Sequence, residues 1–365
     1  MGLFANIKTG NERYPALTGI RAMGAIAVFF DHFPFVPGHH IRINVMAFFF
    51  VLSGFLITRL YYNKIDSPGK NMRAYYVNRF ARIYPVYFLL LTVAVFIKGD
   101  YRPLNLLANY TLTHAFFYNQ DNYIIWQSWS LTVEECFYFL APFIIFIIKK
   151  RGFIPSVLFA GLLLVCALLV SRLGTPLLKT PSFIFSLTFF GNFAEFYAGV
   201  FLALVMMKKE GKGPTSLKGL TYTLSGALGV VILIIVMSFI YARPTLNMKL
   251  IILINNFLIP IPIAALYYGL MCERSLAARL LSARFTAILG KSSYTFYLLH
   301  GIIIYNVCVP WFLPLFGNNY VLCAIITCAF TWLLSALIFM LFEEPVNNLI
   351  RKKFAGRRNT ILRVV

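Results

Sequence analysis

The amino-acid sequence predicts an all-α polytopic membrane protein, a bundle of about ten transmembrane helices with both termini in the cytoplasm. Composition is the first observation, since 60% of the 365 residues are hydrophobic and only 12% are charged. The mean hydropathy of +0.76 excludes an ordinary soluble domain. Apolar stretches long enough to cross a bilayer are the second observation. The ten expected spans are residues 16–34, 43–61, 84–98, 129–148, 153–173, 183–207, 219–241, 249–271, 292–312 and 320–342.

The distribution of positive charge is the third observation. A net charge of +21 would suit a nucleic-acid-binding protein. When the first segment is placed inside, however, most of the 33 lysines and arginines fall in cytoplasmic segments. This is the positive-inside pattern, so the basic excess is mainly topological and no nucleic-acid partner is predicted.

The sequence favours one membrane domain, residues 1–350, followed by a basic cytoplasmic tail, residues 351–365. Residues 1–15 lack the apolar core and cleavage site of a signal peptide, so the first span is expected to act as its own insertion signal. The six cysteines lie in or beside apolar runs without paired loop spacing, which predicts small core residues, with no disulfide framework and no metal site.

The first span carries Arg21 near one end and His32 near the other. Eleven helical positions correspond to three turns plus roughly 20°, so both side chains share a face, about 16 Å apart along the axis. Ionisable groups inside a bilayer are costly and usually face a polar cavity, which makes these two residues functional candidates. In the alternative reading, Arg21 extends to the headgroups and His32 caps the outer end of the helix.

The second and third spans add a small-residue pair and a basic pair. Ser53 and Gly54 lie in mid-membrane, where they either permit close helix packing or provide a hydroxyl that bonds to a neighbour or a bound group. Arg79 and Arg82 are three positions apart and share a helix face, so their guanidiniums can grip a phosphate or pyrophosphate. Lipid headgroup binding and positive-inside anchoring are the alternatives for the basic pair.

The fourth span is expected to begin near Trp129 and to carry two consecutive carboxylates, Glu134 and Glu135. At least one should meet a cation, a histidine or water. This span starts on the side where His32 lies, and a glutamate accepting a hydrogen bond from the imidazole would fix the histidine tautomer and raise its basicity. Glu195 is a further intramembrane carboxylate, with either a cavity or a helix-packing partner.

Three other segments also carry polar side chains in or beside the membrane. Residues 99–127 are too polar to span, so they form an amphipathic segment that lies at the outer interface or folds back into the protein, with His114 interfacial rather than catalytic. The ninth span has hydroxyl groups and His300 along one helix, which suggests a wet face. The tenth ends with Glu343 and Glu344 at the inner surface, before the basic tail.

These motifs together resemble the integral-membrane acyltransferase family 3, whose members O-acylate cell-surface sugars. The resemblance rests on "LTGIRAMGAIAVFFDH", "FFFVLSGFLITR" with "RFARIYP", "WSLTVEECFYFLAP", and "SSYTFYLLHG" with "FEEP", which follow one another over nearly the whole chain. Two departures are Asp31, which can perturb the titration of His32, and Cys136, where a polar residue often follows the two glutamates. The sequence shows no fused extracytoplasmic esterase-like domain, which many relatives carry.

The resemblance implies acyl transfer, usually of acetyl, from cytosolic acyl-coenzyme A to a glycan hydroxyl at the outer face, without a metal. The catalytic residues would be His32, as general base or transient acyl acceptor, Glu134, which orients it, and Arg21, which also guides the donor. Direct transfer and a covalent acyl-histidine both stay open. The remaining expected contacts are Arg79, Arg82, Ser53 and Tyr84 for the donor, and Trp129, Tyr138, Ser130, His300 and Glu135 for the acceptor.

The expected partners are the lipid bilayer, acetyl-coenzyme A and a surface glycan, and the expected location is a bacterial cytoplasmic (inner) membrane. Lipopolysaccharide O-antigen, capsule, exopolysaccharide, peptidoglycan and lipid-linked sugars are all candidate acceptors, with lipopolysaccharide-type glycans favoured. The oligomeric state is open, a homodimer being one option. The rival hypotheses are a transporter or flippase, against which the lack of repeat symmetry argues, and a regulatory protein on an inactive acyltransferase scaffold.

Overall fold

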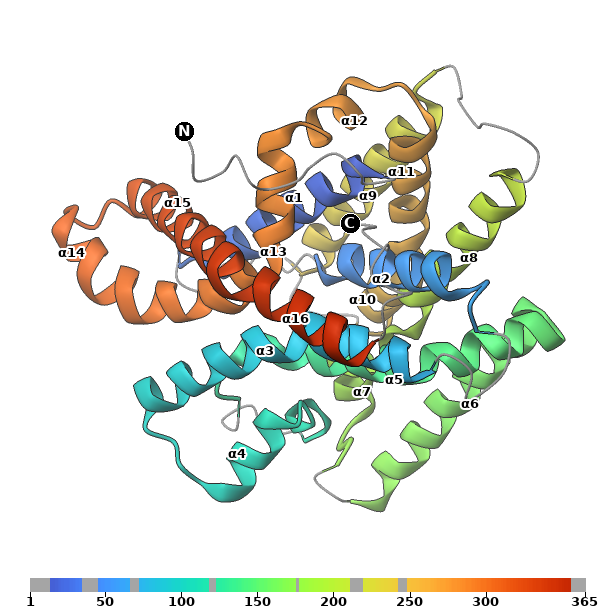
Figure 1. Ribbon diagram of the computed structural model, residues 1–365, viewed down its shortest axis with the longest axis horizontal. Coiled ribbons are helices and arrows are strands. Elements are labelled where there is room, and N and C mark those ends of the chain that lie inside the picture. The colour runs from blue at the N-terminus through green and yellow to red at the C-terminus, as the bar shows by residue number, and fades with distance from the viewer. Residues whose placement is uncertain are drawn as a thin grey trace.

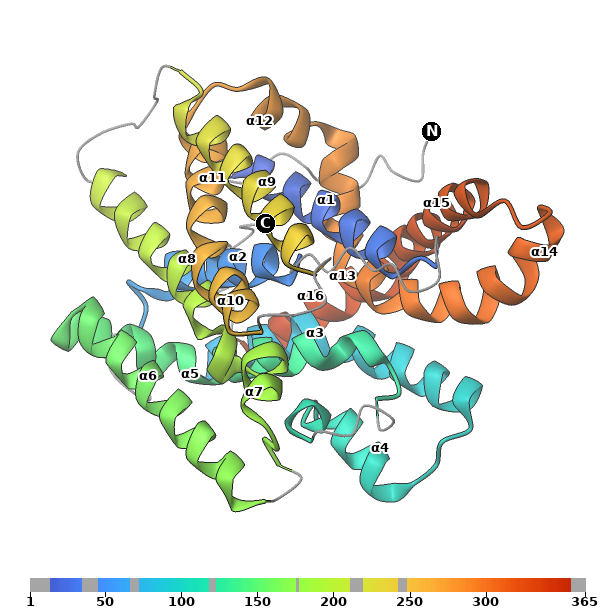
Figure 2. The ribbon, with the colours of Figure 1, turned by 180° about the vertical axis from the view of Figure 1, so that it is seen from behind.

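The computed structural model describes residues 14–34, 45–65, 72–117, 123–174, 177–210, 219–241 and 248–355. Within these ranges the chain is helical, and its one β-type contact is an isolated bridge between Phe117 and Leu177. The helices pack against and cross one another, as two opposite views show (Figures 1 and 2). In chain order they are α1 (Pro15–His32), α2 (Met46–Tyr61), α3 (Met72–Lys98), α4 (Pro103–Tyr110), η1 (His114–Phe116), η3 (Trp126–Ser128), α5 (Trp129–Arg151), α6 (Phe153–Val170), η4 (Ser171–Leu173), α7 (Pro181–Leu187), α8 (Phe189–Glu210), α9 (Thr221–Tyr241), α10 (Met248–Ile252), η5 (Leu253–Leu258), α11 (Pro260–Cys272), α12 (Leu276–Leu281), α13 (Arg284–Ile303), η6 (Ile304–Phe312), α14 (Leu313–Leu315), α15 (Tyr320–Ile338), η7 (Phe339–Glu343) and α16 (Glu344–Phe354).

Eight helical stretches in the described part of the chain are long and apolar enough to cross a membrane. They match the third to tenth predicted spans, so the chain is an all-helical, multi-pass membrane protein. α2 is a shorter apolar helix of 16 residues. α1 is more polar than the eight because it carries Arg21, Asp31 and His32. The total of about ten spans and the side on which the termini lie stay predictions.

Several helices extend beyond the predicted boundaries, among them α13, which begins at Arg284 rather than residue 292. The third span was expected from residue 84, whereas α3 begins at Met72, because the basic residues that precede the apolar run are themselves good helix formers. Arg79 and Arg82 therefore lie in one continuous helix with the membrane segment. α16 runs through the expected start of the tail at residue 351, and residues 356–365 lie outside the described part of the chain.

The buried helices differ from those that face outwards. In the most apolar windows of α5 and of the α7–α8 stretch, 56% and 67% of residues are buried, against 17% in α6 and 22% in α9. The exposed side chains of α6 and α9 are mostly leucine, isoleucine and valine, as expected for helices that contact lipid. Candidate functional side chains are therefore expected on α5 and its neighbours rather than on α6 or α9.

α2 and α8 pack closely enough to require glycine. A Cβ atom on Gly54 would lie 2.0 Å from the carbonyl oxygen of Phe196, and one on Gly199 would lie 1.9 Å from the carbonyl oxygen of Val51. The packing alternative for the Ser53–Gly54 pair is thus confirmed for Gly54. The polar alternative holds for Ser53, whose hydroxyl bonds to a carboxylate described below.

Three π-helical segments interrupt the regular helices. Each contains the residue four positions before a proline, where the pyrrolidine ring would clash with the carbonyl group of a regular α-helix. A wider turn relieves that clash, and such turns are frequent at functional sites. The segments are η5, before Pro260; η6, around Pro310; and η7, before Pro345.

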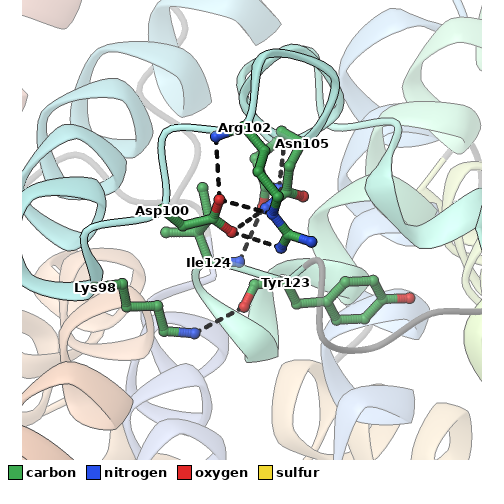
Figure 3. A network of polar contacts seen from close by, with 7 residues as sticks. Lys98, Asp100, Arg102, Asn105, Tyr123 and Ile124 are labelled. Atoms are coloured by element: carbon green, nitrogen blue, oxygen red, sulfur yellow. Dashed lines mark hydrogen bonds and ion pairs between the residues drawn. The ribbon is translucent and has the colours of Figure 1, made fainter.

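The segment between α3 and α5 folds back onto the protein through polar contacts (Figure 3). The Asp100 carboxylate accepts hydrogen bonds from Arg102 Nη2 at 2.7 Å and from Asn105 Nδ2 at 2.5 Å. Lys98 Nζ donates to the carbonyl oxygen of Tyr123 at 2.9 Å. The backbone N–H of Ile124 donates to Asn109 Oδ1 at 3.2 Å, which joins α4 to the strip of chain that leads into η3 and α5.

His114 takes part in this folded-back segment. Its side chain is buried, its ring packs against Tyr123, and its Nε2 lies 2.9 Å from the hydroxyl of Ser128. Burial lowers the pKa of His114 to about 4. The folded-back alternative for the segment is therefore confirmed, and the segment encloses the His114 ring; its depth relative to the membrane interface stays a prediction.

Candidate active site

His32 is the last residue of α1, and its ring meets the ring of His300 from α13. The two helices pack along one another, and α1 crosses α13 in both views (Figures 1 and 2). His32 Nδ1 lies 2.9 Å from His300 Nε2, and the two ring planes are 7° apart. His300 is fully buried, and its Nδ1 lies 2.5 Å from the carbonyl oxygen of Tyr297.

These partners assign the tautomers of both rings. A carbonyl oxygen only accepts, so His300 Nδ1 carries a hydrogen and, in the neutral ring, His300 Nε2 is the acceptor. His32 Nδ1 therefore donates to His300, which leaves His32 Nε2 as the basic nitrogen of the neutral imidazole. The Asp31 carboxylate lies 3.7 Å from that nitrogen and would stabilise an imidazolium formed there.

η3, which leads into α5, holds an indole ring against His32. The Trp126 ring stands edge-on to the His32 ring, with centroids 4.2 Å apart. Next to it, Gln127 Nε2 donates to the carbonyl oxygen of Leu298 at 3.0 Å, and the Tyr297 hydroxyl donates to the carbonyl oxygen of Gln127 at 2.5 Å. These bonds fasten η3 to α13. We call His32, His300, Trp126 and Tyr297 the histidine cluster.

A cavity of about 750 Å³ adjoins the histidine cluster, within the usual size range of a small-molecule site. His32, Trp126, Trp129 and Tyr297 contribute to its lining. Another part of its wall comes from α7, α10 and η5 and carries amide side chains, among them Asn255, whose Oδ1 is buried without a hydrogen-bond partner in the described part of the chain. In the described part of the chain, the lining thus combines aromatic rings, amides, the Asp31 carboxylate and the basic nitrogen of His32.

Glu134 lies deeper, on α5, and does not contact His32. Its Oε1 accepts a hydrogen bond of 2.7 Å from Ser53 Oγ, and the guanidiniums of Arg21 and Arg79 interact electrostatically with it. The expected Glu134–His32 hydrogen bond is wrong, because eight positions separate Glu134 from Trp126, the residue that packs on His32. Eight helical positions are roughly 12 Å. The expectation that Glu134 meets a cation is confirmed.

A second group of polar side chains surrounds Arg21, Arg79 and Arg82, and we call these three the arginine cluster. The Arg79 guanidinium lies over the rings of Tyr61 and Tyr138, at 5.8 and 5.6 Å from their centroids. Such stacking holds the guanidinium in place while leaving its N–H groups at the ring edges for other partners.

Arg82 makes a direct ion pair with a carboxylate. Its Nη1 donates to Glu343 Oε1 at 2.7 Å, and Thr295 Oγ1 donates to Glu343 Oε2 at 2.5 Å. Glu343 is 2% exposed, so it is buried within the protein. η7 turns this carboxylate inward, toward α3 and α13. Arg21 also interacts electrostatically with Glu343.

The other predicted contact residues divide between the two clusters. Trp129 lines the cavity, and the Ser130 hydroxyl bonds to that of Tyr297 at 2.7 Å. Tyr138 instead joins the arginine cluster, 3.4 Å from Ser53 Oγ. The Tyr84 ring stacks on Phe80 and lies within electrostatic range of Glu135. The roles of all these residues in binding stay predictions.

Sequence reasoning did not single out Trp126, Gln127 or Asn255. Asn255 and Asn256 form an adjacent amide pair inside an otherwise apolar span, which is a signal of the same kind as the intramembrane glutamates. Trp126 and Gln127 carried no such signal, because they precede the span and only the fold brings them to His32.

Comparison with known proteins identifies the family to which these clusters belong. The sequence profile of a family described as an acyltransferase domain matches residues 14–340. The chain belongs to acyltransferase family 3. The match includes the histidine cluster and the arginine cluster, and it ends before η7 is complete and before α16 begins.

Relatives with similar sequences carry names consistent with the family. A putative peptidoglycan O-acetyltransferase of Bacillus subtilis, YrhL, is 28% identical, over 96% of this chain and 57% of its own length. The peptidoglycan O-acetyltransferase OatA of Listeria monocytogenes is 27% identical, over 44% of this chain and 29% of its own length. The chain thus spans little more than half of the first of these relatives and less of the second. No solved structure matches.

Proposed function

We propose that this acyltransferase-family chain is a membrane O-acetyltransferase that transfers an acetyl group from cytosolic acetyl-coenzyme A to a hydroxyl of a cell-surface glycan. The observation that carries the proposal is the His32–His300 pair at a cavity, on the same helix as Arg21 of the arginine cluster. A base at one end of a helix and cations at the other suit a long ligand with a reactive thioester and a phosphorylated end.

The arginine cluster would bind the donor. Arg79 and Arg82 would hold its phosphates, and Arg21 would guide the pantetheine arm toward His32. The roughly 16 Å of helix between Arg21 and His32 is about the length of that arm. Ser53 and Glu134 lie beside Arg21 and Arg79, where their hydrogen bond would orient the donor path.

The histidine cluster would perform the transfer. His32 Nε2 would take the proton of the glycan hydroxyl as that oxygen attacks the thioester carbonyl, forming the C–O bond while the C–S bond breaks. The proton would then pass to the leaving coenzyme A thiolate. In the covalent variant, Nε2 itself accepts the acetyl group before the hydroxyl does. The tautomer set by His300 provides the lone pair that either route needs.

The acceptor would enter the cavity beside His32. Aromatic rings can cover the apolar faces of a sugar ring, and amides can bond to its hydroxyl or acetamido groups. The names of the two relatives favour peptidoglycan over lipopolysaccharide as the acceptor class. We place the chain in a bacterial cytoplasmic membrane, with the arginine cluster toward the cytoplasm and the cavity toward the outer face.

Transfer of labelled acetyl in membrane vesicles tests this function. Vesicles with wild type, His32→Ala or Arg21→Ala would receive radiolabelled acetyl-coenzyme A and cell-wall glycan. We expect base-labile label on the glycan with wild type, and its loss in both variants at equal protein level. Consumption of the donor at equal rates by all three would contradict the role of His32, and no consumption by wild type would contradict the donor.

A further inference from the structure

The C-terminal helix α16 brings another arginine to the arginine cluster. α16 packs along α3, and the red helix lies directly against the cyan one in Figure 1. Three basic residues follow one another near its end, and they differ in burial: Arg351 is partly buried, whereas Lys352 and Lys353 are exposed. Arg351 therefore faces the protein rather than solvent or lipid headgroups.

Arg351 lies close to other positively charged side chains. It lies within electrostatic range of Arg79, Arg82 and the Tyr61 ring, on which the Arg79 guanidinium also packs. Guanidiniums held together repel one another, and taking them out of water adds a further cost unless a counter-charge is present. The repulsion and desolvation at Arg351 therefore have to be offset by a negative charge nearby.

Among these three arginines, Arg82 alone makes an ion pair with a described carboxylate, while Glu134 acts on Arg79 only as a nearby charge. Arg82 pairs with Glu343. Among the described residues, neither Arg79 nor Arg351 makes an ion pair, and the Nε atom of each is buried without a hydrogen-bond partner. Two neighbouring arginines whose Nε donors are buried and lack a hydrogen-bond partner in the described part of the chain can bind an anion with several oxygens.

We propose that Arg351 and Arg79 together bind a phosphate group, so that α16 completes the donor site. The assignment of this phosphate to acetyl-coenzyme A rests on the proposed function. Arg351 lies beyond residue 340, where the family match ends, so its role is inferred from this chain's own structure. A membrane phospholipid headgroup is the other source of the same phosphate chemistry.

Binding of adenosine 3′,5′-bisphosphate to the purified full chain tests the inference. The probe carries the 3′-phosphate and the first 5′-phosphate of coenzyme A, without the second 5′-phosphate, the pantetheine arm or the thioester. Thermal shifts against probe concentration would be measured in detergent for wild type, Arg351→Gln and Lys352→Gln. We expect affinity to fall at least about tenfold in Arg351→Gln and less than twofold in Lys352→Gln, the matched loss of one charge on the same helix. Arg351→Lys should be intermediate, because it keeps the charge but loses the planar fork.

The outcomes separate this inference from the proposed function. Equal affinity of wild type and Arg351→Gln, or no binding of the probe by wild type, would overturn the phosphate assignment. Stabilisation by phosphatidic acid vesicles that depends on Arg351, with no competition by the bisphosphate, would overturn the donor assignment in favour of a lipid headgroup. Failure of wild type to turn over acetyl-coenzyme A would instead contradict the proposed function.

Discussion

The His32 ring is held by the His300 side chain, and His300 is held in turn by the carbonyl oxygen of Tyr297. This chain of two hydrogen bonds fixes which nitrogen of His32 has the lone pair. His300 touches neither donor nor acceptor in the proposal, so it is a positioning residue. The sequence indicated His300 as a polar residue on a wet face, but the tautomer argument needed the 2.9 Å contact.

His300→Phe should lower kcat for acetyl transfer about 100-fold with KM for acetyl-coenzyme A within about twofold, because His32 would lose the acceptor that fixes its tautomer. His300→Gln should lose less, since its amide oxygen can still accept from His32 Nδ1. Steady-state kinetics with both substrates varied measures the difference. His114→Gln, at a second buried histidine, is the matched control and should leave kcat unchanged. Equal losses in His300→Phe and His300→Gln would contradict the tautomer role.

His114 predicts a pH dependence of stability. Its folded-state pKa of about 4 lies below the ordinary value of 6.5, so the unfolded chain binds a proton in this range while the folded chain does not. Above pH 6.5 the His114 ring is neutral in both states and does not lower the stability. As the pH falls from 6.5 toward 4, protonation of the unfolded chain lowers the free energy of unfolding, by about 3 kcal/mol at most. Thermal unfolding in detergent from pH 4 to 8 should show a steeper acid loss for wild type than for His114→Gln. Parallel curves would contradict the burial argument.

At the level of helices, close packing and prolines set the position of the functional side chains. The Gly54–Phe196 contact brings α2 against α8, with Ser53 beside it bonded to Glu134. The π-helical segments η5 and η7 carry Asn255 and Glu343 into the protein. Glycines and prolines were visible in the sequence, but which helices would approach one another was not, because apolar periodicity does not name a partner.

Gly54→Ala should destabilise the protein by about 1–3 kcal/mol, since a Cβ atom 2.0 Å from a carbonyl oxygen forces α2 and α8 apart. Gly161→Ala is the control, because a Cβ atom there meets nothing within 4 Å, and it should be neutral or stabilising by up to about 1 kcal/mol. Thermal unfolding of both variants in the same detergent gives the comparison. A Gly54→Ala protein as stable as wild type would show that α2 and α8 can separate without cost.

Across the whole molecule, two polar clusters lie inside an otherwise apolar bundle, and α1 joins them, with Arg21 and His32 about three helical turns apart. The cluster members Arg21, His32 and Arg79, and Glu134 beside the arginines, were found from the sequence, because ionisable residues inside apolar spans are conspicuous. The contacts among these residues were not found from the sequence, since His32 contacts His300 and Glu134 bonds to Ser53. Arg351 was assigned to a cytoplasmic tail because the amphipathic helix α16 looks like a basic terminus until its contact with α3 is known.

In the proposed function, the arginine cluster binds acetyl-coenzyme A and the histidine cluster performs the transfer. The kinetics of His32→Gln and Arg79→Gln test this assignment most directly. With acetyl-coenzyme A varied at saturating glycan, His32→Gln should lower kcat at least 100-fold with KM within about twofold. Arg79→Gln should raise KM for acetyl-coenzyme A about tenfold while kcat stays within threefold. A change of KM alone in His32→Gln, or a loss of kcat alone in Arg79→Gln, would contradict the account.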